Sequence, residues 1–208
     1  MRKRPKQERS RQMVATIIQA TELAIARKGF ESVTANYVAE LAGISKGSLY
    51  QYFADRNDLL NALMEKLSDD ILSVLDSEIP IRKSDSLFDL VLGSIRAGSS
   101  VIQSNRGVYL QMIKHWHELP MERLADKLQI RLLEIAQIYF LRHHREYPIS
   151  HLPERLFICF NSVMFTMMRL YSQAKKTLDE DQILLGLAQM VTRFLEMLDD
   201  EQRVASTS

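Results

Sequence analysis

The chain has 208 residues, of which 46% are apolar and 25% charged. This is the composition of a globular protein, and it excludes a disordered chain, a collagen-like fibre and a coiled-coil rod. Seven glycines and five prolines are few for this length, which argues against a turn-rich all-β fold. The single cysteine, Cys159, can form neither an intrachain disulfide nor a thiolate zinc site, so we expect a buried thiol in a reducing compartment.

The charge is unevenly distributed along the chain. The net charge is +1, but residues 1–60 carry ten Lys and Arg against six Asp and Glu, whereas residues 61–208 carry 17 against 20. Among the first eleven residues, six basic side chains face the single acid Glu8. Such a basic arm is typical of a segment that meets a polyanion, and a solvated, frayed terminus is the alternative.

No membrane span or export signal is visible. The longest uncharged, apolar-rich window, 156–168, is shorter than the roughly 20 residues of a membrane span. Polar residues also interrupt the apolar stretch that a signal peptide would need near the N-terminus. We therefore expect a cytoplasmic protein without a membrane partner.

The N-terminal part of the chain contains start and stop signals for three helices. Apolar residues at 3.6-residue spacing predict a helix over 10–28 that Gly29 terminates. Thr34 is expected to cap a second helix that ends at Gly43, and Ser45 to cap a very short third helix.

A long fourth helix is predicted from Asp55, which can form a start resembling a capping box with Asp58. No segment alternates with period two, so the fold class is all-α with about nine helices. Prolines divide the rest of the chain into five further helical segments, 84–103, 106–117, 121–146, 153–175 and 179–202.

Residues 34–53 have the features of a helix-turn-helix. Ala39 is small where two helices must cross closely, and Gly43 permits the positive φ of a tight turn. An ordinary corner between two helices would need the same two residues, but the basic arm before it and Arg56 after it favour DNA binding. The short second helix offers hydrogen-bonding side chains to a major groove, namely Lys46, Ser48, Tyr50 and Gln51.

These residues carry a resemblance to a known family over about residues 10–60. They are Gly29-Phe30, Thr34, Val38-Ala39, Ala42-Gly43-Ile44-Ser45, Gly47-Ser48-Leu49-Tyr50, Tyr52-Phe53 and Leu59-Leu60. In this order and spacing they resemble the N-terminal signature of TetR/AcrR-type transcriptional regulators. We therefore divide the chain into a basic arm with a helix-turn-helix DNA-binding domain, 1–54, and a larger helical effector-binding and dimerisation domain, 55–208.

The resemblance implies roles for individual residues. Thr34 and Tyr50 would hold phosphates, and Lys46 and Ser48 would approach bases or backbone from the recognition helix. Tyr52 would pack at the edge of the groove. Arg56 occupies the position at which the family commonly has a lysine that contacts the DNA backbone. The expected DNA-binding residues are Thr34, Ser45, Lys46, Ser48, Tyr50, Gln51, Tyr52 and Arg56.

The last two predicted helices are apolar around most of their circumference. A helix of this kind is covered on both sides, so we expect a second copy of the chain to cover them, with a purely intrachain core as the alternative. The resemblance also implies a homodimer through these two helices. The expected interface residues are Phe157, Phe160, Met164, Met168, Leu187, Val191 and Phe194.

The middle helices contain aromatic and methionine side chains that could line a cavity for a small apolar or amphipathic effector. Each of these side chains could equally belong to an ordinary core. The candidate ligand-binding residues are Tyr109, Met112, His115, Trp116, Tyr139, Met164, Phe165 and Met168.

Neither a metal site, a cofactor nor an enzymatic activity is expected. On a helix, His115 and His117 would point about 200° apart and could not share a metal ion without a bend. One histidine could instead bond to an effector or sense pH. The sequence has no phosphate-binding glycine loop and no nucleophile elbow, and Glu118 beside the two histidines is the one pairing that an enzyme could use.

The sequence thus predicts a DNA-binding transcriptional regulator. In the first interpretation it is a homodimeric repressor that a small ligand releases from a pseudo-palindromic operator in double-stranded DNA. In the alternative it is a dimeric DNA-binding interaction protein without a small-molecule effector. A cavity of about 300 Å³ or more in the second domain would favour the first, and an exposed apolar patch the second.

Overall fold

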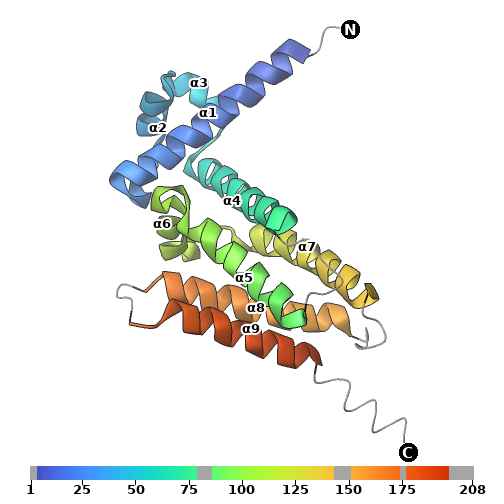
Figure 1. The fold of residues 1–208 in the computed structure, drawn as a ribbon. Helices are drawn as coiled ribbons and strands as arrows, with labels where there is room; N and C mark the ends of the chain where they lie inside the picture. The colour runs from blue at the N-terminus through green and yellow to red at the C-terminus, as the bar shows by residue number, and fades with distance from the viewer. Residues whose placement is uncertain (1–3, 79–85, 143–150, 174–176, 197–208) are drawn as a thin grey trace, which may run out of the picture. The chain divides into compact units, whose positions relative to one another are not determined.

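A computed structural model describes residues 4–78, 86–142, 151–173 and 177–196 (Figure 1). These residues form nine α-helices and no strand, which confirms the all-α fold class. The α-helices are α1 (Arg4–Lys28), α2 (Ala35–Ala42), α3 (Lys46–Tyr50), α4 (Arg56–Glu78), α5 (Leu87–Gln103), α6 (Val108–Lys114), α7 (Met121–Arg142), α8 (Leu152–Tyr171) and α9 (Glu180–Glu196). Three single 3₁₀ turns join them, η1 (Phe30–Ser32), η2 (Asn105–Gly107) and η3 (Trp116–Glu118).

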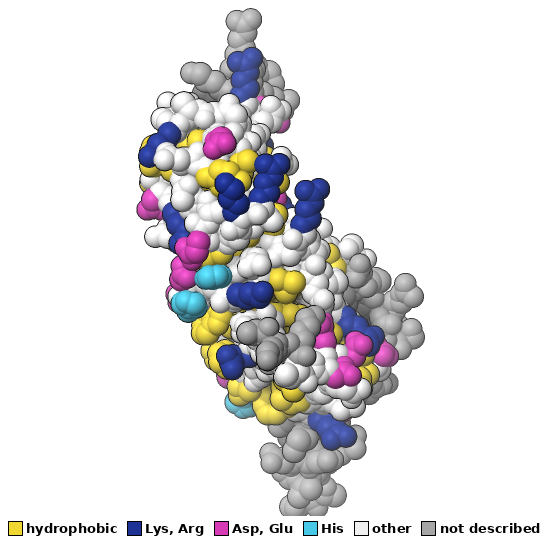
Figure 2. Space-filling model, turned by 90° about the vertical axis from the view of Figure 1, so that its left-hand side faces the viewer, with side chains coloured by type: hydrophobic (Ala, Val, Ile, Leu, Met, Phe, Trp, Pro, Cys, Tyr) yellow, Lys and Arg dark blue, Asp and Glu magenta, His cyan; other side chains and the backbone are white. Residues whose placement is uncertain are grey.

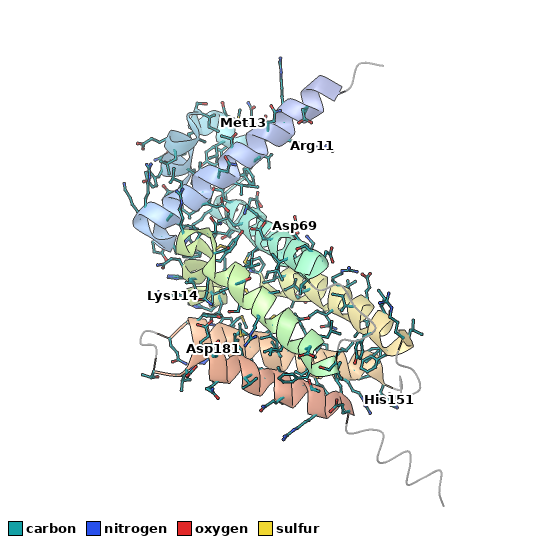
Figure 3. All side chains as sticks on the ribbon, viewed as in Figure 1. Arg11, Met13, Asp69, Lys114, His151 and Asp181 are labelled. Carbon is teal, nitrogen blue, oxygen red and sulfur yellow. The ribbon has the colours of Figure 1, made fainter. Side chains whose placement is uncertain are left out.

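Helix α1 begins six residues earlier than the sequence predicts. It starts at Arg4 instead of residue 10, so residues 4–9, which we expected in an arm, belong to the helix. Arg9 and Arg11 are exposed on α1, where Figure 3 labels Arg11. The first three residues of the predicted arm lie outside the described part of the chain.

The predicted caps of α2 and α3 are confirmed. Thr34 Oγ1 accepts a hydrogen bond from the Tyr37 N–H at 3.3 Å, and Ser45 Oγ accepts one from the Ser48 N–H at 3.0 Å. Gly43, with φ 67° and ψ 30°, ends α2 in the left-handed region that favours glycine. These caps satisfy backbone donors that a short helix leaves free, so they fix where α3 begins.

The start of α4 agrees with the prediction, whereas α6 is shorter than predicted. Asp55 Oδ1 accepts from the Asp58 N–H at 3.0 Å, as predicted, and Asp58 Oδ2 accepts from the Ala54 N–H at 2.9 Å, one residue before the N–H that a capping box uses. Helix α6 spans Val108–Lys114 and is therefore shorter than the helix that the sequence predicts over 106–117. The predicted residues 84–85, 143–146, 174–175 and 197–202 lie outside the described residues.

The chain forms two compact units. The first contains residues up to 67 together with 102–121, and the second contains 68–101 and the residues from 122 onward. The first unit therefore holds α1 to α3, the first half of α4, and α6. The boundary between residues 54 and 55 that we assigned from the sequence stays a prediction.

Each unit has its own apolar core. In the first unit, Ile17 and Ile25 of α1 are buried, as are Val38 of α2 and Leu49 of α3, and α2 packs on α1 while α3 packs on α2. In the second unit, α8 and α9 lie side by side (Figure 1). Their buried residues include Cys159, Met167, Met168, Leu184, Leu187, Ala188, Val191 and Leu195.

Burial raises the pKa of the Cys159 thiol to about 11. The thiol is therefore protonated at neutral pH and behaves as the buried hydrophobe that we predicted. No helix in the described ranges is both long and apolar enough to cross a lipid bilayer.

Candidate nucleic-acid interface

Helix α3 has a buried side and an exposed side. Leu49 is fully buried and anchors the helix, whereas Lys46 and Gln51 are exposed and 47% of Tyr50 is accessible. The Lys46 Nζ lies 5.7 Å from the centroid of the Tyr50 ring, one helical turn away. The exposed side thus offers a cation and a phenol on a helix of five residues, with the amide of Gln51 directly after it, which suits contacts with phosphates and base edges.

Ser45 and Ser48 contact each other at the start of α3. Their hydroxyl oxygens are 2.9 Å apart, in addition to the cap that Ser45 makes with the Ser48 backbone. Both hydroxyls therefore have a structural role in fixing the first turn of the helix. A contact of either with DNA stays a prediction, as does the contact expected of Tyr52, whose ring is partly exposed.

A basic side chain from the end of α1 lies beside the first turn of α2, and sequence reasoning missed it. Lys28 Nζ lies 4.2 Å from the centroid of the Tyr37 ring, and the Tyr37 N–H in turn bonds to Thr34. Lys28, Tyr37 and Thr34 thus form a cationic and hydrogen-bonding group at the start of α2, where a helix favours anions. No local pattern signals this pairing, because Lys28 belongs to the end of the preceding helix.

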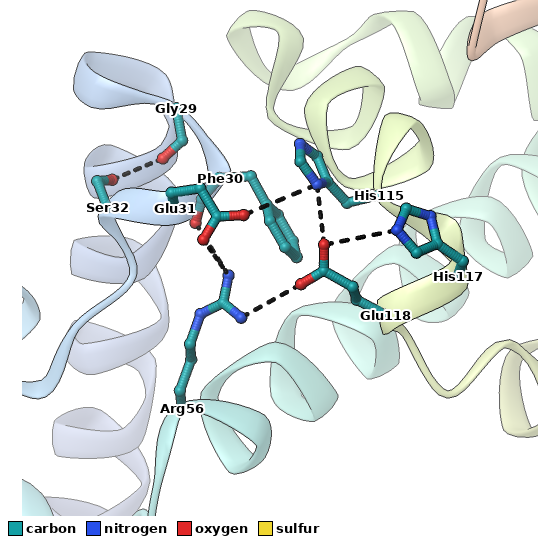
Figure 4. Close-up of polar contacts among 8 residues, drawn as sticks. All are labelled: Gly29, Phe30, Glu31, Ser32, Arg56, His115, His117 and Glu118. Atoms are coloured by element: carbon teal, nitrogen blue, oxygen red, sulfur yellow. Dashed lines mark hydrogen bonds and ion pairs between the residues drawn. The ribbon is translucent and has the colours of Figure 1, made fainter.

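Arg56 has more partners than the sequence predicts. Its guanidinium lies 3.5 Å from carboxylate oxygens of both Glu31 and Glu118, and 4.8 Å from the centroid of the Phe30 ring (Figure 4). These contacts hold the guanidinium within the first unit. The expected contact of Arg56 with a DNA phosphate stays a prediction and would require the guanidinium to be shared with, or released from, the two carboxylates.

The structure brings together the two histidines and the glutamate that sequence reasoning considered for an enzyme. His115 Nδ1 is 3.1 Å from Glu118 Oε1, and His117 Nε2 is 3.7 Å from the same oxygen. The hydrogen bond with His115, followed by the contacts with Arg56, holds the pKa of Glu118 below its ordinary value of 4.5. Glu118 is therefore ionised at neutral pH and cannot serve there as a proton donor.

The predicted dimer-interface residues divide between the core and the surface of the second unit. Met168, Leu187 and Val191 are buried within the single chain, and their expected contact with a second copy stays a prediction. By contrast, Phe157 is 55% and Phe194 is 37% exposed, and Phe160 and Met164 are half-buried. Exposed apolar side chains that the prediction missed are Ile158 on α8 and Met190 on α9.

The predicted ligand-binding residues are divided between the two units. Tyr109 and Met112 are buried in the first unit, where Tyr109 OH accepts a hydrogen bond from Lys66 Nζ at 3.0 Å. His115 and Trp116 are partly exposed in the same unit. In the second unit, Tyr139 and Met168 are buried, Met164 is half-buried, and Phe165 is exposed. Phe165 therefore groups with the surface residues of α8.

Comparison with known proteins gives matches of two lengths. Residues 17–63 match the family described as bacterial regulatory proteins, tetR family. The HTH-type transcriptional regulator TtgR of Pseudomonas putida is 35% identical over 60 residues, which is 29% of each chain. The nucleoid occlusion factor SlmA of Mannheimia succiniciproducens is 24% identical over 145 residues, covering 67% of this chain and 66% of that relative.

A solved structure confirms the similarity of the fold beyond the helix-turn-helix. The TetR-family regulator of Streptomyces coelicolor superposes with a TM-score of 0.58 at 16% identity, covering 94% of this chain and 99% of that one. At this identity the likeness shows the fold alone.

Proposed function

We propose that this chain, whose residues 17–63 match the tetR family of bacterial regulatory proteins, acts as a homodimeric repressor on a pseudo-palindromic operator in double-stranded DNA. The observation that carries the proposal is α3, a capped helix of five residues whose Leu49 is buried while Lys46 and Tyr50 point outward. A short helix anchored in this way can enter a major groove of about 12 Å width with its polar side chains toward the bases.

The surface of the second unit supports dimerisation. Phe157, Ile158 and Phe165 lie within about 100° of one another around α8, and Met190 and Phe194 are one turn apart on α9. Neighbouring helices with exposed aromatic side chains expose apolar surface to water unless a partner covers it. A second copy of the same two helices would cover it in a symmetric four-helix arrangement.

A small apolar or amphipathic ligand is the effector that we propose for this repressor. The second unit contains aromatic and methionine side chains of the kind that lines such sites, among them Tyr139 of α7 and Met164 of α8. We propose no enzymatic activity, since the matching family consists by its description of regulatory proteins.

A second candidate function is a dimeric DNA-binding interaction protein without a small-molecule effector. Two observations favour it. The relative matched over 145 residues is named a nucleoid occlusion factor, whereas the match to the transcriptional regulator TtgR covers 60 residues. In addition, Ile130, Ile138 and Leu141 are exposed along one stripe of α7, which offers an apolar surface to a partner.

Selection of bound fragments from random double-stranded DNA, followed by hydroxyl-radical footprinting, tests the shared part of both proposals. We expect two symmetric protected half-sites with centres about 34 Å or somewhat more apart, bound by a dimer. An asymmetric single half-site bound by a monomer would remove both the dimer and the operator.

The two candidates differ in their response to ligands. Binding to the selected DNA would be measured against a panel of apolar and amphipathic compounds, with thermal unfolding followed in parallel. A compound that raises the unfolding temperature and weakens DNA binding supports the repressor. A panel without effect on either quantity supports the interaction protein.

A further inference from the structure

Two histidines and two glutamates of the first unit converge beside Arg56 (Figure 4). Glu31 belongs to the turn η1 between α1 and α2, whereas His115 directly follows α6, and His117 and Glu118 lie in η3. Histidine and acidic side chains are side by side on the surface in Figure 2 as well. This group therefore joins a turn of the DNA-binding part to a segment more than 80 residues later in the sequence.

The ligand atoms of three of these residues are close enough to share one metal ion. His115 Nδ1 is 3.1 Å from Glu118 Oε1 and 3.9 Å from Glu31 Oε1. Taken together, one ligand atom each from Glu31, His115 and Glu118 lies within 4.8 Å of the others. A tetrahedral Zn²⁺ with bonds of 2.0–2.2 Å needs ligand atoms about 3.3 Å apart. The adjustment required is about 1.5 Å at most, and Glu31, with 74% of its side chain exposed, has room to make it.

The two oxygens of each carboxylate face different partners. The Oε1 atoms of Glu31 and Glu118 face His115, whereas their Oε2 atoms face the Arg56 guanidinium at 3.5 Å. Arg56 thus orients both carboxylates from outside while it leaves the oxygens on the histidine side for an ion, as outer partners of metal ligands do. Two carboxylates and one guanidinium also leave one net negative charge to attract a cation.

The imidazole of His115 is held in position by an aromatic neighbour. It stacks on the Phe30 ring with centroids 4.4 Å apart and an angle of 10° between the planes. A stacked ring turns little, so Nδ1 stays directed toward the carboxylates. His117 Nε2, 3.7 Å from Glu118 Oε1, is within reach as a fourth ligand.

The end of α6 explains why the sequence argued against such a site. The expectation that His115 and His117 point about 200° apart assumes a continuous helix. In the structure α6 ends at Lys114, and His115 has φ −108° and ψ 26°, which is outside the helical region. The two histidines therefore approach the same carboxylate oxygen.

We propose that Glu31, His115 and Glu118 bind a divalent transition-metal ion of the Zn²⁺ type, with His117 as the fourth ligand. Imidazole nitrogen and carboxylate oxygen together suit Zn²⁺ and related ions, whereas Mg²⁺ prefers oxygen ligands alone. The ion would bind the Nδ1 lone pair of the neutral imidazole tautomer of His115 that carries its proton on Nε2, together with the ionised carboxylates of Glu31 and Glu118. This proposal goes beyond the DNA-binding function and does not depend on it.

The test uses the full chain after removal of metal by a chelator. Zn²⁺ is titrated in competition with a chromophoric chelator, and the apparent Kd is measured for the wild type and for two variants, His115→Asn and the double variant Glu31→Gln with Glu118→Gln. We expect one Zn²⁺ per chain, a loss of affinity of about tenfold or more in either variant, and no competition by Mg²⁺.

Matched controls address nonspecific binding. His151→Asn replaces an exposed histidine at a left-handed position that asparagine tolerates, and Glu40→Gln replaces an exposed glutamate of α2. A third control, His143→Asn with His144→Asn, removes a histidine pair that lies outside the described residues. We expect all three controls to bind Zn²⁺ as the wild type does.

Two results would overturn the proposal. One is the absence of wild-type binding at millimolar Zn²⁺, and the other is unchanged affinity in both His115→Asn and the double glutamate variant. X-ray absorption of the Zn²⁺-loaded wild type tests the same point without any substitution. One or two imidazoles with oxygen ligands agree with the proposed site, and a shell of oxygen ligands alone contradicts it.

Discussion

The helix-turn-helix and the α8–α9 pair differ in how their side chains meet the expectations from sequence. In the helix-turn-helix, Leu49 is buried, Lys46 and Tyr50 are exposed, and the expected cap of α3 is formed. In α8 and α9, three of the seven side chains assigned to an interface are buried within the single chain, as Leu187 illustrates.

The difference lies in the kind of signal that each region contains. Caps and turn glycines act over three or four residues, so Thr34, Gly43 and Ser45 determine where the helices begin and end without help from distant parts of the chain. From the apolar residues around most of α8 and α9, we can infer only that their side chains are buried against some neighbour. The apolar pattern does not say whether α5, α7 or a second copy of the chain covers them.

The largest effect is expected when a charge is placed in the α8–α9 core. Leu187→Asp and Met168→Asp would bury an unpaired carboxylate, at a cost of several kcal/mol, and should unfold the second unit. Because both side chains are buried within one chain, we expect loss of the fold and not only separation of a dimer. Far-UV circular dichroism and thermal melting measure this, and a well-folded monomer would show that these side chains face a partner.

A charge on the exposed face of the same two helices should act differently. Phe157→Asp and Phe194→Asp place the carboxylate where water can reach it in the monomer, so folding should be preserved while a dimer loses its apolar contact. Sedimentation velocity should show a folded monomer. Ile130→Asp on α7 is the matched control, and dissociation by that variant alone would move the interface to α7.

The structure also separates what was predictable from what was not. Helix type, the order of the helices and the caps of α2, α3 and α4 follow from local patterns. The contacts of Arg56 with Glu31 and Glu118 do not, because no short-range pattern relates residues so far apart in the sequence. The end of α6 at Lys114 was missed for a related reason, since residues 115–119 contain no proline or glycine to mark it and the first proline after it is Pro120.

A smaller effect is expected at Ser45, where the cap and a DNA contact can be distinguished. Ser45→Ala removes the acceptor for the Ser48 N–H and should lower the free energy of unfolding by about 1 kcal/mol. Ser45→Asp restores a cap but places a negative charge near the phosphates, so it should keep stability and weaken DNA binding. Urea unfolding beside DNA titration measures both quantities. Wild-type DNA binding by Ser45→Asp would place Ser45 away from the DNA.

The smallest effect concerns the acid range of the first unit. Because the pKa of Glu118 is lowered in the folded state, its ionised form stabilises the fold above the ordinary value of 4.5, and this contribution is lost as the pH falls through the folded-state pKa. Glu118→Gln lacks the contribution at every pH. The difference in unfolding free energy between the wild type and Glu118→Gln should therefore shrink as the pH falls from 4.5 through the folded-state pKa. A difference that grows in this range would contradict the assignment.

Salt-titrated DNA binding of α3 variants tests the central claim, that this helix is the part that reads DNA. Binding is measured on a selected site and on scrambled DNA. If Lys46 contacts a base, Lys46→Ala should cost about 1–3 kcal/mol of binding free energy on the selected site. If Lys46 contacts a phosphate alone, the loss should be the same on both DNAs and the salt slope of binding should be shallower by about 1. Tyr50→Ala should weaken binding to both DNAs alike, and both variants should melt as the wild type does, because their side chains lie outside the core. Arg193→Ala, which removes an exposed cation of α9, is the control. Unchanged affinity in both α3 variants would contradict the account.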